Sequence, residues 1–108
     1  MSALLVISTF PDADTARQIG TALVQKQLAA CVNITPGIES IFHWKGKLDY
    51  EPEILAIFKT SEEAYPALEA ALIELHPYDL PEVIAIEIAR GSKPYLDWIC
   101  ESSTGNRE

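Results

Sequence analysis

Basic residues are scarce in this 108-residue sequence. Eight lysines and arginines stand against sixteen aspartates and glutamates, so the formal net charge at pH 7 is -8. A surface of that sign repels phosphate backbones and anionic lipid headgroups, and it attracts cations. We therefore expect no nucleic acid and no membrane among the partners of this protein.

Cysteine is also rare, with only two residues, Cys31 and Cys100. They lie too far apart for a C-x-x-C pair, and isolated thiols in such a chain are more often free than bridged. The apolar run at the start has no preceding basic residue and no clear small-residue cleavage site, so it is read as a strand rather than a secretory leader. These features predict a cytoplasmic location.

Sequence motifs of catalysis are missing as well. The chain has no glycine-rich phosphate loop, no G-x-S-x-G and no H-E-x-x-H, and neither cysteine has a histidine base that the sequence makes evident. We therefore predict that the protein is not an enzyme and has no obligatory cofactor.

Apolar residues, by contrast, are abundant at 48% of the chain, which fits one globular domain over residues 1–108. The run ALLVISTF (3–10) predicts a strand that ends before Pro11. Asp12 or Asp14 then caps a helix that is expected to continue to LAAC (28–31).

A long hairpin is predicted next. Residues 31–44 alternate as a strand with a bend at Pro36-Gly37, KGK (45–47) forms a tight turn, and the chain returns through ILAIFKT (54–60).

The remaining segments complete the predicted fold. Apolar spacing indicates a helix over residues 65–75 with Pro66 in its first turn, and EVIAIEIA (82–89) reads as a strand. A short helix capped by Ser92 follows, and residues 102–108 are expected to form a flexible tail. This order predicts an α+β, ferredoxin-like βαββαβ antiparallel sheet with both main helices on one face and an additional C-terminal helix.

Such a sheet leaves one face without helices. In ILAIFK, Ile54 and Ala56 point to one side and Leu55 and Ile57 to the other, so both faces are apolar. An exposed patch of that size is unusual for a soluble monomer. Symmetric self-association would cover it in every copy. A monomer with a long solvated hairpin is the alternative.

Five segments occur in an order typical of one known family. They are LAACVNI, SIFHWKGKL, FKT, LHPYDLPEV and YLDWI. On these segments the chain resembles the CutA family of divalent-cation tolerance proteins, over residues 3 to about 101. The resemblance implies a PII-like homotrimer in which three sheets face one another. It also implies a response to copper and other divalent cations.

The resemblance suggests one metal ligand. In some members metal binding is attributed to a first-strand cysteine and to histidine at the junction of helix and strand. Here Ser8 occupies the first position, so only His76 carries over. Imidazole suits Cu(II) and similar ions, and Asp79 and Glu82 could add oxygen ligands. The alternative is that His76 only interacts with the end of the helix before Pro77.

Two further residues with ligand chemistry are expected to serve structure instead. Cys31 matches the cysteine of the family's LAAC segment, but it begins a strand in apolar surroundings, where a packed thiol is expected. His43 lies between two aromatic residues of the hairpin and points away from both, which favours a surface or interface position.

Two other functions stay open. The protein could be a PII-like sensor of a small anionic ligand, bound in clefts between subunits and lined by Trp44, Lys59, Tyr78 and Glu82. Lys59 ends an otherwise apolar strand, so it either pairs with a carboxylate of a neighbouring chain or binds an anion. Alternatively, the trimer is a platform for another protein.

Overall fold

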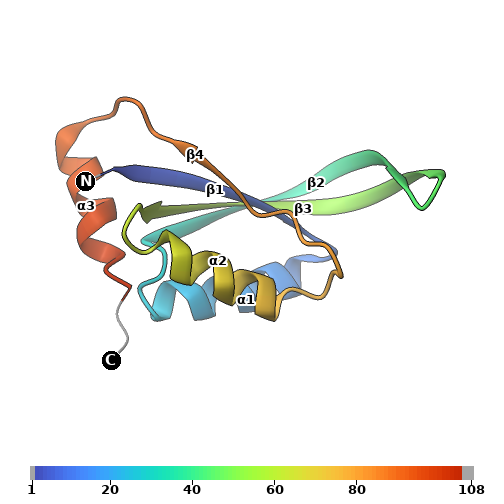
Figure 1. Cartoon of the computed structure of the whole chain (residues 1–108), viewed down its shortest axis with the longest axis horizontal. Coiled ribbons are helices and arrows are strands. Elements are labelled where there is room, and N and C mark those ends of the chain that lie inside the picture. Colours follow the sequence, from blue (N-terminus) through green and yellow to red (C-terminus); the bar gives the residue numbers. More distant parts are fainter. Residues whose placement is uncertain (1, 106–108) are drawn as a thin grey trace.

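The computed structural model describes residues 2–105, which form a mixed α+β domain built on a single four-stranded antiparallel sheet (Figure 1). The strand order is β2-β3-β1-β4, and α1 and α2 lie together on one face of the sheet, while α3 lies at the end opposite the hairpin tip. This confirms the predicted ferredoxin-like fold. The elements are β1 (Ala3–Phe10), α1 (Ala13–Gln25), β2 (Cys31–Trp44), β3 (Lys47–Ser61), α2 (Tyr65–Leu75), β4 (Ile84–Glu87) and α3 (Lys93–Ser102).

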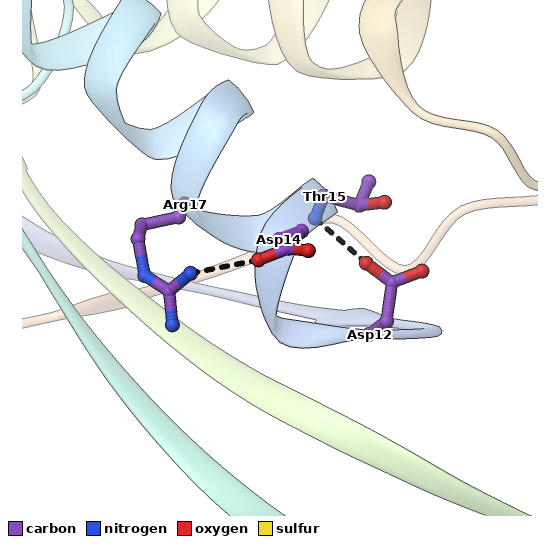
Figure 2. A network of polar contacts seen from close by, with 4 residues as sticks. All are labelled: Asp12, Asp14, Thr15 and Arg17. Carbon is purple, nitrogen blue, oxygen red and sulfur yellow. Dashed lines mark hydrogen bonds and ion pairs between the residues drawn. The ribbon is translucent and has the colours of Figure 1, made fainter.

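The start of α1 is fixed by a side-chain cap. Asp12 has extended backbone geometry, and its Oδ1 accepts a hydrogen bond of 2.7 Å from the Thr15 amide (Figure 2). This bond satisfies one of the amides left free in a first helical turn. One turn further on, the Arg17 guanidinium forms an exposed ion pair of 2.9 Å with Asp14, which contributes little to stability.

The end of α1 differs from the prediction. The helix stops at Gln25, before the LAAC segment (28–31) at which the sequence predicts its end. Gln27 takes a left-handed conformation (φ 58°), its amide donates to Val24, and the Leu28 amide donates to the Leu23 carbonyl. This pair of bonds is a Schellman motif, which needs a left-handed residue and usually recruits glycine. With glutamine in that position, no local signal in the sequence marks the end of the helix.

The hairpin of β2 and β3 agrees with the prediction at its bend and its turn. The strand register shifts between Thr35 and Ile38, so the Pro36-Gly37 pair forms the expected bulge. Lys45 and Gly46 both have positive φ, as a tight hairpin turn requires. However, β3 starts directly after this turn at Lys47, so the acidic stretch before Ile54 belongs to the strand. The hairpin extends well beyond the helices (Figure 1).

The second half of the chain follows the predicted order with a shorter last strand. Pro66 lies in the first turn of α2, and Ser92 caps α3 by accepting a hydrogen bond from the Tyr95 amide at 3.3 Å. The fourth strand was expected over residues 82–89, but β4 covers only Ile84–Glu87, which is the part that pairs with β1.

The predicted flexible tail is wrong for residues 102–105. Ser102 is the last residue of α3, and Ser103 is fully buried. The Ser103 hydroxyl accepts a bond of 2.9 Å from the Ser61 amide, and its carbonyl accepts one of 2.6 Å from the Ser61 hydroxyl. The Gly105 amide donates to the Gln27 carbonyl. Residues 106–108 lie outside the described part of the chain.

The two faces of the sheet are packed very differently. The face toward α1 and α2 carries the main core, with fully buried Val6, Phe10, Leu23, Phe58, Leu68 and Leu72. The opposite face, here called the open face, carries apolar residues that alternate with the core residues along the strands: Leu5, Ile7, Leu55 and Ile57, which are half-buried, and Ile84 and Ile86, which are exposed. The bare apolar face expected from the sequence is therefore present in the described chain.

Between residues 2 and 105, no helix is long and apolar enough to cross a membrane.

Candidate functional site

A cavity of about 720 Å³ lies between the hairpin and the connector that follows α2. The connector is the HPYDLP segment (76–81), which joins α2 to β4. Two kinds of side chain dominate the lining. Five are carboxylates: Asp49, Glu51, Glu53, Asp79 and Glu82. Six are apolar: Pro11, Ile41, Phe42, Trp44, Pro52 and Leu80. The lining contains no basic side chain.

Strand alternation brings the hairpin part of this lining together. Phe42 is paired directly with Asp49, and Ser40 with Glu51. Residues paired across an antiparallel ladder point to the same face, and so do residues two apart along one strand. Glu53, two residues beyond Glu51, therefore shares the same face. As a result, one side of the hairpin presents three carboxylates on β3, with Ser40 and the rings of Phe42 and Trp44 on β2.

Glu53 connects the hairpin to the connector. The Ser40 hydroxyl donates to Glu53 Oε1 and the Tyr78 hydroxyl donates to Glu53 Oε2, both at 2.6 Å. The side chain of Glu53 is only 9% exposed. Burial, together with the hydrogen bond to the Glu53 carboxylate, raises the pKa of Tyr78 well above its ordinary value, so this phenol stays a proton donor. The contact fixes one wall of the cavity.

His76 lies behind this wall and does not line the cavity. Its Nε2 is 2.8 Å from the Thr9 carbonyl oxygen, and its Nδ1 accepts a 3.1 Å bond from the Tyr78 amide. Because a carbonyl can only accept, Nε2 carries the proton and the ring is neutral. The ring also stacks on Phe10, with 4.5 Å between centroids. Desolvation by this burial lowers the pKa of His76, although the Thr9 carbonyl and the Glu53 charge oppose the change.

These contacts explain HPYDLP as a connector. His76 takes extended backbone geometry, so it ends α2, and both of its ring nitrogens then hold neighbouring backbone in place. A metal ion could reach a ring nitrogen only by displacing one of these bonds. Asp79 and Glu82, expected to assist His76, line the cavity instead. Within residues 2–105, no group of three or more histidine, cysteine, aspartate or glutamate side chains is arranged to hold a metal ion.

Within one chain, the four residues expected in clefts between subunits lie in two places. Trp44, Tyr78 and Glu82 all line the cavity. Lys59 does not, because it lies toward the other end of β3, where its Nζ donates to the Tyr95 hydroxyl at 3.3 Å and lies 5.5 Å from the Tyr95 ring centroid. Cys31 is a free, half-buried thiol paired with Lys59 in the sheet, whereas His43 is exposed on the hairpin.

Sequence reasoning missed the carboxylates of β3. The predicted return strand begins only at Ile54, so it leaves out Asp49, Glu51 and Glu53, although their alternate spacing is itself a strand signal. The long-range bond between Glu53 and Tyr78 joins residues 25 apart and has no local signature.

The buried neutral state of His76 predicts a pH dependence of stability. Its pKa in the folded chain lies below the ordinary value of 6.5, so the unfolded chain binds a proton more readily. The free energy of unfolding should therefore fall as pH decreases below about 6.5. Above that pH, His76 should change it little. Chemical denaturation at about pH 5 and about pH 7.5 measures this, with His76→Gln as the comparison. An equal loss of stability in the variant would contradict the assignment.

Comparisons with known proteins agree with the resemblance noted from the sequence. The profile of the CutA1 divalent ion tolerance protein family matches residues 4–102. The divalent-cation tolerance protein CutA of Thermus thermophilus is 44% identical over 99 residues, which cover 92% of this chain and 96% of that protein. Its solved structure has a TM-score of 0.91 and covers 94% of this chain and 98% of that one.

Other relatives extend the comparison to different cell compartments. The chloroplastic CutA protein of Arabidopsis thaliana is 41% identical over 104 residues, which are 96% of this chain but only 57% of that longer protein. The structure of the periplasmic divalent cation tolerance protein CutA from Archaeoglobus fulgidus is 39% identical, with a TM-score of 0.90 and coverage of 94% of this chain and 98% of that one. On these matches, the chain belongs to the CutA1 family of divalent ion tolerance proteins.

Proposed function

We propose that this protein contributes to the tolerance of divalent cations, above all copper. In this proposal it is a homotrimer that binds the ion and catalyses no reaction. The observation that carries this proposal is the cavity lined by five carboxylates and no basic side chain. Together with a net charge of -8, such a lining raises the local concentration of cations. The name of the family adds support, since it describes tolerance of divalent ions.

The homotrimer is proposed to form through the open face. Ile84 and Ile86 are about half exposed there, at 50% and 49%, and they adjoin the half-buried Ile7 and Leu5 on the neighbouring strand. Apolar area of this kind favours association, and a closed ring of copies would cover it in each subunit.

The proposed copper ligand is His76, although the ring is hydrogen-bonded on both sides. Its Nδ1 already presents a lone pair, because it accepts the Tyr78 amide bond. Displacing that amide would free the lone pair for a metal ion. The cost of the lost bond and of moving a buried ring predicts modest affinity.

The metal proposal is tested by calorimetric titration of the whole protein with Cu(II). A site present in the natural sequence should be lost in His76→Ala and kept in His43→Ala, the matched control on the exposed hairpin. Circular dichroism of each variant establishes that it is folded before titration. If all three proteins bind Cu(II) equally, His76 is not a copper ligand.

One observation favours the second candidate function, a sensor of a small anion. In the described chain, Lys59 has no carboxylate within ion-pair distance, and its side chain contacts the hydroxyl and the ring of Tyr95. An anion would have to bind there, because the carboxylates of the cavity repel it.

The cytoplasm remains our proposal for the location of this protein. It is supported by two free cysteines, which are typical of reducing compartments. The relatives named chloroplastic and periplasmic show that the family is not restricted to one compartment.

A further inference from the structure

We propose that Tyr78 controls the access of a metal ion to His76, and that the bond from the Tyr78 hydroxyl to Glu53 keeps this access closed. This inference rests on the proposed role of His76 as the copper ligand, and it adds the residue that regulates that site. The His76 side chain belongs to a residue that is only 7% exposed. A metal ion can therefore reach the ring only after one of its neighbours moves.

Two of the groups around the His76 ring are fixed in the sheet. The Thr9 carbonyl oxygen is 2.8 Å from Nε2, and the Phe10 ring stacks on the imidazole. Both residues belong to β1, where they are paired with Leu55 and Ile54 of β3. Moving either of them would break the ladder at the centre of the sheet. The ring therefore cannot open on this side.

Tyr78 closes the other side of the ring through two contacts. Its amide donates to Nδ1 at 3.1 Å, and its own ring lies 4.7 Å from the imidazole between centroids, tilted by 46°. Pro77 has no amide hydrogen, so Tyr78 is the first residue after His76 whose amide can donate to this nitrogen. Tyr78 lies outside the helices and strands, so its backbone can move without loss of regular structure. Nδ1 is therefore the nitrogen that can be uncovered.

The bond to Glu53 holds Tyr78 in the closed position. The Tyr78 hydroxyl donates to Glu53 Oε2 at 2.6 Å, and Oε1 of the same carboxylate accepts a bond of 2.6 Å from Ser40 on the neighbouring strand. Hydrogen bonds to a carboxylate are stronger than those between neutral groups. Because the amide and the hydroxyl belong to one residue, moving the amide away from Nδ1 strains the bond at Glu53. The hairpin strands thereby resist the opening of the metal ligand.

Access to His76 then follows a two-state equilibrium of Tyr78. In the closed state the amide occupies Nδ1, and in the open state the lone pair is free. The apparent affinity of an ion that binds only the open state is reduced in proportion to the fraction of open molecules. Exchange of the amide hydrogen with solvent also requires local opening. Loss of the bond to Glu53 should therefore raise the metal affinity and the exchange rate by the same factor.

The test is Tyr78→Phe, which removes the hydroxyl and keeps the ring that covers the imidazole. We expect calorimetric titration of the whole protein to show about tenfold tighter Cu(II) binding, a factor that fits the loss of one hydrogen bond to a charged group. Zn(II) should gain the same factor, because the closed state excludes both ions alike. In the metal-free protein, hydrogen exchange of the amide at position 78 should accelerate about tenfold. Tyr65→Phe on α2, which loses a hydroxyl outside this contact, is the matched control and should change neither quantity.

The control by Tyr78 and the copper site itself fail in different ways. If Cu(II) binding is lost in His76→Ala but unchanged in Tyr78→Phe, the copper site stands and the control by Tyr78 is wrong. If neither the natural protein nor Tyr78→Phe binds Cu(II) through His76, the copper ligand is wrong, and the control by Tyr78 is wrong with it. Faster exchange without tighter binding would make Tyr78 a structural residue of the connector alone. Tighter binding that disappears in the double variant with His76→Ala would support both proposals.

Discussion

Replacing Ile86 with arginine is expected to convert the proposed trimer into monomers of 11.9 kDa. Ile86 lies on the open face, paired with Leu5 of β1, and is 49% exposed in the single chain. In an assembly that covers this face, the arginine would be buried without a carboxylate to pair with. Such a burial costs several kcal/mol per copy (about 3–5 kcal/mol when a charge is left unpaired), which is enough to dissociate most protein assemblies.

Sedimentation velocity at several protein concentrations measures this outcome. The matched control is Ile73→Arg on α2, because Ile73 is also 49% exposed but lies on a helix rather than on the open face. The control should sediment like the natural protein. A trimer that survives Ile86→Arg would place the interface elsewhere. A natural protein that is folded and sediments at 11.9 kDa when dilute would remove the trimer altogether.

Replacing Phe58 with alanine is expected to lower the free energy of unfolding by about 3–5 kcal/mol. Phe58 is fully buried at the centre of the sheet, where it is paired with Val6 on one side and Val32 on the other. Both neighbouring strands are fixed by their own ladders, so the structure can close little of the space that the ring leaves. The loss therefore includes a cavity contribution as well as the lost burial of the ring.

Guanidinium denaturation at one fixed protomer concentration measures this effect, because assembly makes stability depend on concentration. Phe42→Ala is the matched control, since this phenylalanine lies on the hairpin and is 37% exposed. Phe42→Ala should lower the free energy of unfolding clearly less than Phe58→Ala does. Comparable losses at the two positions would mean that the hairpin is buried in the assembly as deeply as the core is in the subunit.

The fold could be predicted well from the sequence where local chemistry determines it. The apolar run of β1, the bulge at Pro36-Gly37 and the cap at Ser92 all have local causes, and the structure confirms each. The end of α1 could not be predicted, because Gln27 takes a conformation that usually indicates glycine. The buried position of Ser103 depends on Ser61, which is 42 residues away.

The candidate site was predicted in clefts between subunits, so one chain shows only how its residues are distributed. Trp44, Tyr78 and Glu82 line one cavity, whereas Lys59 lies toward the other end of β3, beside Tyr95. The hydrogen bond of His76 Nε2 depends on Thr9, 67 residues earlier, and no spacing rule could reveal it.

The position of β1 has a consequence for how the chain reaches its native state. This strand is synthesised before its two neighbours in the sheet, β3 and β4, which begin at Lys47 and Ile84. Contacts between such distant segments slow folding. Until the later strands emerge, the apolar β1 has unsatisfied edges on both sides, so the nascent protein would be a substrate for chaperones and prone to aggregate at high expression rates.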